Sequence, residues 1–144
     1  MKKLFFLLFC LIILAAPFNS VNASDESPKE IIQAAQQGDA GAQRELGAMY
    51  YFGEGVPQDY KEAIKWYSKS AEQNYVKSQV MLGYMYYHGE GVPQEYVLAH
   101  MWFNLASTQG NVNALEFRDI AAVKMTPAQI EEAQKLANEW KPEK

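Results

Sequence analysis

The chain has 144 residues, with 13 basic and 17 acidic side chains and a formal net charge of −4 at pH 7. An acidic surface argues against binding to nucleic-acid phosphates or anionic lipid. The single cysteine excludes an internal disulfide and a CxxC site.

Residues 1–23 read as a secretory signal peptide. Lys2 and Lys3 begin it, the thirteen residues from Leu4 to Ala16 are apolar, and Val-Asn-Ala ending at Ala23 offers a cleavage site. A spanning helix needs about 20 residues, so we expect cleavage and export to the periplasm or beyond the cell, with no membrane attachment afterwards. An uncleaved anchor is the alternative, and a lipoprotein is disfavoured because Cys10 lies deep in the apolar run.

Cleavage would leave eleven basic and seventeen acidic side chains, a net charge near −6. Residues 24–41 are expected to form a linker and a capping helix. Ala34 and Ala35 lie 36 residues before Ser70 and Ala71. This spacing is the period of the repeat that follows.

Residues 42–77 and 78–113 form an internal repeat. At a lag of 36 they share seventeen identical pairs, far more than chance gives. Each unit reads as two helices, here called A and B. The A helix of the first unit places Ala42, Leu46, Met49 and Tyr50 on one face, and its B helix does the same with Ala63, Trp66, Tyr67, Ser70 and Ala71.

A glycine-rich loop joins the two helices of each unit. We expect Gly53 to end the A helix in the left-handed conformation. Asp59 should cap the B helix, with Glu62 completing a capping box. Glu95 in the second copy should cap more weakly. A phosphate-binding loop would need a preceding strand and a third glycine, which are missing.

The repeated pattern A-x3-LG-x2-Y-x2-GxGVPQD-x3-A-x2-W-x3-S-A resembles the Sel-one-like repeat family, a relative of the tetratricopeptide repeats. This resemblance implies an all-α fold, a right-handed α-solenoid of antiparallel helix pairs with about seven helices. It also implies a scaffold or adaptor role rather than catalysis. The residues that carry it are Leu46, Gly47, Tyr50, Gly53, Gly55, Pro57, Ala63 and Trp66, with Leu82, Gly83, Tyr86, Gly89, Gly91, Pro93, Ala99 and Trp102 in the second copy.

Residues 114–144 are expected to form a degenerate third repeat with a closing helix. Thr126 is its expected N-cap, Pro127 its first residue, and Gln129 completes a capping box. Four charged positions of the first B helix become apolar in the second, which indicates that the closing helix covers them. A partner-binding patch is the alternative reading of these residues, Val97, Leu98, Met101 and Leu105.

No catalytic constellation stands out. His88 and His100 belong to no metal-binding pattern, and no serine lies in a GxSxG motif. Glu54 and Glu90 could pair as in glycosidases, but as repeat equivalents they are more simply turn residues. We expect no catalytic residue, cofactor or metal.

The remaining candidates lie on the A-helix face opposite the core. Solenoids bind on their concave side, and exposed tyrosines are common interface anchors. Ile120 and Val123 share this face but are expected to be covered.

The expected function is non-enzymatic binding of a protein or peptide by an exported monomer. An envelope enzyme or cell-wall-ligand binder and a self-associating module are the alternatives. The candidate residues are Arg44, Tyr51, Val80, Tyr84, Tyr87 and His88.

Overall fold

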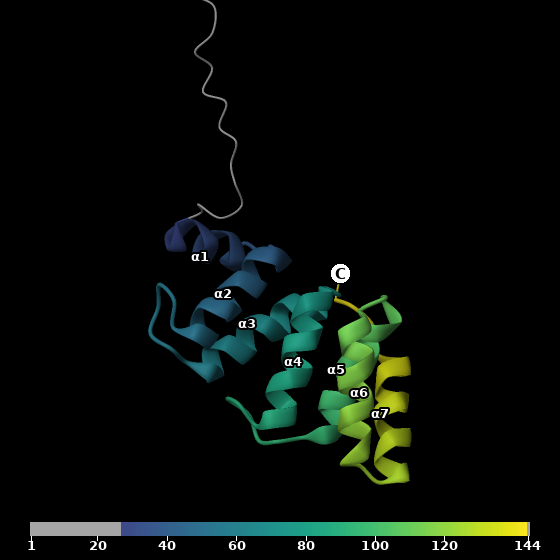
Figure 1. Ribbon diagram of the computed structural model, residues 1–144. Helices are drawn as coiled ribbons and strands as arrows, with labels where there is room; N and C mark the ends of the chain where they lie inside the picture. The colour runs from purple at the N-terminus through teal and green to yellow at the C-terminus, as the bar shows by residue number, and fades with distance from the viewer. Residues whose placement is uncertain (1–26, 144) are drawn as a thin grey trace, which may run out of the picture.

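The computed structural model describes residues 27–143, so the predicted signal peptide lies outside the described residues. Within that range the chain forms seven helices and no strand (Figure 1), which confirms the all-α prediction. No helix in this range is both long and apolar enough to span a membrane. The helices are α1 (Pro28–Gln36), α2 (Ala40–Phe52), α3 (Tyr60–Glu72), α4 (Val76–His88), α5 (Tyr96–Thr108), α6 (Val112–Val123) and α7 (Pro127–Glu139).

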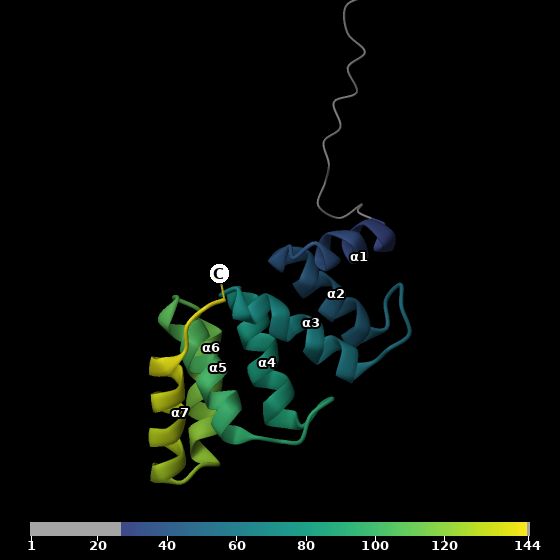
Figure 2. The ribbon, with the colours of Figure 1, turned by 180° about the vertical axis from the view of Figure 1, so that it is seen from behind.

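The helices pack in chain order as a solenoid. Each of α1 to α5 contacts the next helix, and α7 returns to pack against α5. Figures 1 and 2 show the resulting row of helices, with α1 at one end and α6 and α7 at the other. The pairs α2–α3 and α4–α5 correspond to the two predicted repeats, and α6 is the A helix of the third.

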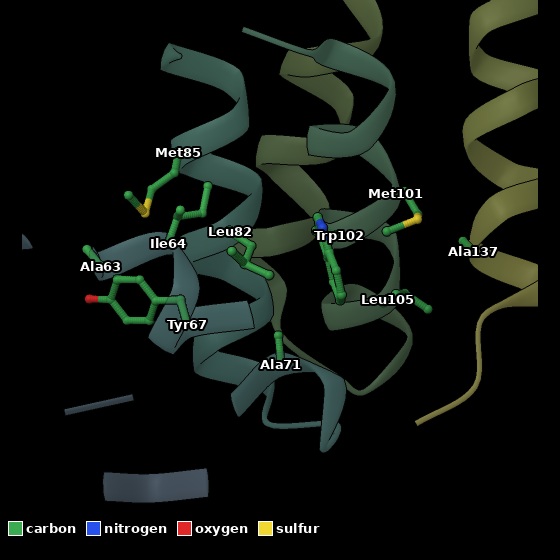
Figure 3. Close-up of a cluster of buried hydrophobic side chains, with 10 residues drawn as sticks. All are labelled: Ala63, Ile64, Tyr67, Ala71, Leu82, Met85, Met101, Trp102, Leu105 and Ala137. Carbon is green, nitrogen blue, oxygen red and sulfur yellow. The ribbon is translucent and has the colours of Figure 1, made fainter. Parts of the chain in front are cut away.

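In each helix pair, a glycine of the A helix packs against an aromatic ring of the B helix. A Cβ on Gly47 would lie 2.9 Å from the ring of Tyr67, and one on Gly83 would lie 2.5 Å from the ring of Phe103. The missing side chain therefore lets the backbone approach the ring closely. Figure 3 shows Tyr67 in the main core cluster beside Leu82, which is fully buried.

The two repeat tryptophans occupy matching buried places, as predicted. Trp66 is 9% exposed and Trp102 is 8% exposed. Different side chains pack against the two rings, a lysine in the first repeat and another tryptophan in the second. The ammonium group of Lys69 lies 4.7 Å from the Trp66 ring centroid. Trp140, the C-cap residue of α7, packs edge-on against Trp102 with ring centroids 6.1 Å apart.

The loops confirm most of the predicted turn chemistry. Gly53 ends α2 with φ 72°, in the left-handed region. Asp59 caps α3 through the amides of Lys61 and Glu62, and Glu95 makes no such bond. The predicted capping box is wrong, because the Asp59 amide already donates to the Tyr50 carbonyl at 2.9 Å. The Glu62 carboxylate lies instead 3.3 Å from Lys65 Nζ.

A ladder of glutamines links successive repeats, and the sequence analysis did not identify it. Gln43 donates to the Ala35 carbonyl at the end of α1 and accepts from Gln73 at 2.7 Å. Gln79 and Gln109 repeat the contact at 2.9 Å one period later. The next equivalent position is Leu115, so the ladder stops at α6.

The closing helix forms as predicted. Thr126 and Gln129 make the capping box, and α7 then packs on α5. The buried Ala137 of α7 lies in the same cluster as Met101 and Leu105, and Leu98 packs against that cluster. This arrangement confirms that α7 covers the apolar side of α5.

The expected burial of Ile120 and Val123 is wrong. Ile120 is 45% exposed and Val123 is 83% exposed. Because α7 lies on α5, no helix covers this side of α6 in the described chain. Asp119 occupies the position of Gly47 and Gly83, against which an aromatic ring of the B helix packs in each of the two repeats.

Candidate partner-binding groove

Two adjoining hollows lie along the A helices. The first, the polar hollow, has a volume of about 280 Å³ and lies between α2, α4 and the start of α6. The second, the aromatic hollow, has a volume of about 160 Å³ and lies between α4, α5 and α6. Phe117 lines both, so the two hollows adjoin at this residue, and together they are here called the A-helix groove.

Aromatic rings from α4 build one wall of the aromatic hollow. Tyr84 lies 4.3 Å from His88 between ring centroids, and Tyr87 lies 5.0 Å from the same imidazole. Phe103 of α5 and Ile120 of α6 complete the lining with Phe117. The hollow is therefore lined by aromatic rings in tilted and edge-on contact, with little polar surface.

Hydrogen-bond donors gather in the polar hollow. Arg44 pairs with its neighbour Glu45 at 2.9 Å through Nη2, while its Nε is buried and has no partner among the described residues. Tyr67 is 1% exposed and lines the same hollow. Burial raises the pKa of the Tyr67 phenol to about 12, partly offset by the nearby Arg44 charge. Tyr67 therefore keeps its proton and remains a donor at neutral pH.

The structure gathers five of the six candidate residues in the groove. Arg44 and Val80 line the polar hollow. Tyr84, Tyr87 and His88 line the aromatic hollow.

Tyr51, the sixth candidate, lines neither hollow. Its hydroxyl donates to Glu90 of the next loop at 2.7 Å. Burial, and then this bond to a carboxylate, raise the pKa of Tyr51. Tyr51 thus connects the first repeat to the second loop.

Sequence reasoning missed several residues of the groove, among them Phe52, Tyr67, Lys77 and Phe117. Phe52 is the repeat equivalent of His88, and Phe117 is the equivalent of Met81, so the period could have found both. Lys77, the first residue after Val76 in α4, also lines the polar hollow. The sequence did not indicate that Tyr67 lines the groove, because its position in the B helix predicted only a place in the core.

The titratable side chains near the groove are few. Within residues 27–143, no group of three or more His, Cys, Asp or Glu side chains is placed so that it could hold a metal ion. His100 is buried in α5, and burial, with the Arg118 charge, lowers its pKa. Glu90 is engaged by Tyr51. The groove instead offers shape, aromatic surface and donors.

Comparison with solved structures identifies similar folds. A protective antigen, c5321, from uropathogenic Escherichia coli displays an SLR fold and is 38% identical, with a TM-score of 0.76 over 78% of this chain and 24% of its own. A Sel1 repeat protein from Oxalobacter formigenes is 37% identical, with a TM-score of 0.61 over 62% of this chain and 26% of its own. The chain thus spans about a quarter of the length of these two relatives.

No curated protein matches the sequence. The family model of the Sel1 repeat matches residues 40–75 and 76–111, which is 72 of the 144 residues. Its period of 36 residues is that of the internal repeat, with each unit beginning two residues before the boundaries used above. The chain belongs to the Sel1 repeat family.

Proposed function

We propose that this protein is an exported, non-enzymatic scaffold that binds a protein or peptide partner through the A-helix groove. The observation that carries the proposal is the pair of adjoining hollows along α4 and α6. Their lining combines aromatic side chains with Arg44, and aromatic residues and arginine are the residue types enriched at the centres of protein interfaces.

The family supports a binding role, because Sel1 repeats form helical scaffolds that commonly mediate protein interactions. The basic and apolar start of the sequence supports export. The solved relative described as a protective antigen is compatible with a location outside the cytoplasm. Fractionation of expressing cells, with sequencing of the mature N-terminus, tests export. A start at Ser24 is expected, and an intact Met1 in the soluble cytoplasmic fraction would contradict it.

Partner binding is tested by quantitative affinity capture from envelope extracts. Tyr84→Ala should remove the partner or reduce its recovery about tenfold, because a central aromatic anchor contributes 2 kcal/mol or more in hot spots, roughly 30-fold in affinity. Tyr60→Ala is the matched control. Tyr60 is 37% exposed against 36% for Tyr84, and it lines neither hollow. Equal recovery by both variants would refute a role for the groove.

The alternatives give different outcomes in simple assays. Turnover of peptidoglycan fragments or of nitrocefin by the purified protein would show an enzyme. Size-exclusion chromatography with light scattering should give a monomer. A concentration-dependent dimer abolished by Val123→Lys would instead show that the exposed side of α6 mediates self-association, since Val123 is 83% exposed there.

A further inference from the structure

We infer that the polar hollow binds a carboxylate of an acidic peptide segment, while the aromatic hollow receives a neighbouring apolar side chain of the same segment. This inference rests on the proposed function, because it names the kind of partner segment that the A-helix groove accepts. Three features of the groove support it: its unused donors, its charge and its size.

Two donors in the polar hollow lack acceptors within the described chain. Arg44 Nε is buried without a partner, and Glu45 occupies only Nη2 of that guanidinium. The hydroxyl of Tyr67 forms no hydrogen bond with a described residue, and Figure 3 shows it at the edge of the core, pointing away from Leu82. A buried donor such as Arg44 Nε is unfavourable without an acceptor, and the Tyr67 hydroxyl is free to donate to a ligand.

The charge of the hollow favours an anionic acceptor. Its lining includes Arg44 and Lys77 but no Asp or Glu. Lys77 is exposed and forms no ion pair within residues 27–143. This local positive charge stands out on a chain whose net charge is −4. Hydrogen bonds from a guanidinium or ammonium to a carboxylate are stronger than those to a neutral acceptor, so an Asp or Glu side chain is the preferred ligand.

The size of the hollows favours a peptide over a free small molecule. Each is smaller than the roughly 300–1,000 Å³ of pockets that enclose drug-sized ligands. The aromatic hollow, at about 160 Å³ and with Tyr84 and Phe103 in its lining, has room for one apolar side chain. Because Phe117 borders both hollows, a single extended segment can place a carboxylate in one and an apolar residue in the other.

The test is fluorescence anisotropy with labelled peptides in which one Glu and one Phe are separated by glycine–serine spacers of different length. Matched peptides carry Ala or Lys in place of Glu. We expect at least one spacing for which the Glu peptide binds about tenfold more tightly than the Ala peptide, with the Lys peptide weaker still. Free glutamate at the same concentration should not displace it, because it lacks the apolar anchor.

Variants of the protein separate a ligand contact from a structural role. Tyr67→Phe removes only the hydroxyl, so it should weaken the Glu peptide about threefold to tenfold and leave the Ala peptide unchanged. Lys77→Glu should abolish the preference for Glu. Lys61→Glu makes the same charge change at an exposed position of α3 that lines neither hollow, and should leave binding unchanged.

Three results would overturn the inference. Equal binding of the Glu, Ala and Lys peptides would show that the groove accepts peptides without using its donors, which leaves the proposed function standing. Failure of every peptide at millimolar concentration would also refute the acidic-segment inference. In that case, capture of a partner by the wild-type protein and its loss in Tyr84→Ala would still support the proposed function. Displacement by free glutamate alone would identify a small-carboxylate site instead.

Discussion

The second glycine of each loop packs against the start of the helix that precedes its own helix pair. Gly91 has φ 74°, and a Cβ there would lie 2.4 Å from the Tyr60 carbonyl oxygen at the start of α3. Gly55 has φ 77° and faces Pro28 at the start of α1. The loop sequence therefore recurs because each copy forms a contact between successive repeats.

Substitution of Gly91 tests this contact. Gly91→Ala should lower the free energy of unfolding by roughly 2–4 kcal/mol, because it adds a clash with backbone to the strain of a positive φ. Gly110→Ala is the matched control. Gly110 also has positive φ, 90°, but a Cβ there meets nothing within 4 Å, so only about 1–2 kcal/mol is expected. Equal losses in urea denaturation would contradict a role in joining the repeats.

His100 makes the stability of the fold depend on pH. The side chain is 3% exposed, its Nδ1 lacks a partner among the described residues, and burial, then Arg118, lower its pKa, with a smaller opposing effect of Asp119. The neutral form is therefore the one that the fold accommodates. This contribution to stability is present above the ordinary histidine pKa of about 6.5 and is lost as the pH falls through that value towards the folded pKa.

The free energy of unfolding should accordingly fall between pH 7 and pH 5, by at most about 1.4 kcal/mol per pH unit for one proton. His100→Gln, which does not titrate, should flatten this slope. The comparison isolates His100 because Glu72, whose pKa is raised by burial and by Glu143, contributes a slope of opposite sign in both proteins. An unchanged slope in the variant would contradict the assignment.

At the scale of the elements, α7 replaces a third B helix without occupying its place. Asp119 stands where Gly47 and Gly83 admit an aromatic ring, and α7 packs instead on α5. The contact of Trp140 with Trp102 takes the place of the Lys69–Trp66 contact of the first repeat. The array therefore ends with one side of its last A helix exposed.

Truncation of Trp140 tests how firmly α7 is held. Trp140→Ala should lower the free energy of unfolding by about 1–3 kcal/mol, because a half-buried aromatic pair is lost. Lys135→Ala, at a side chain 72% exposed on the same helix, should change it by less than about 0.5 kcal/mol. A loss no larger for Trp140 than for Lys135 would show that α7 contributes little to stability.

The repeat period explains how much of the fold could be predicted. The turn and capping residues predicted the left-handed Gly53, the Asp59 cap and the start of α7. The apolar residues Met101 and Leu105, which replace charged residues of the first repeat, predicted where α7 packs. The capping box failed because the Asp59 amide is used by Tyr50, a contact across the loop that local sequence does not show.

The groove was less predictable than the fold. The spacing of residues on the outer face of the A helices identified Tyr84 and Tyr87. It also selected Tyr51, whose hydroxyl donates to Glu90, 39 positions away. It could not find Tyr67, because a core ring that reaches the opposite surface depends on the close approach at Gly47. The exposure of Ile120 depended on where α7 packs, which the pattern of α6 alone does not determine.

At the scale of the whole molecule, the protein presents the A-helix groove on a stack of helix pairs. The outer charge of the chain is acidic, whereas the polar hollow contains Arg44 and Lys77 and no carboxylate in its lining. This contrast gives the A-helix side a different preference from the rest of the surface. We therefore expect the A-helix side to contact the partner.

Site-specific photo-crosslinking in living cells tests that claim most directly. The photoreactive residue p-benzoylphenylalanine would replace Tyr84 in the groove or, in a separate strain, Lys61 on α3 outside it. Irradiation should link a partner to the protein carrying the probe at position 84 and none to the protein carrying it at position 61. A partner captured only from position 61, or no adduct at position 84, would contradict the assignment of the A-helix groove as the binding surface.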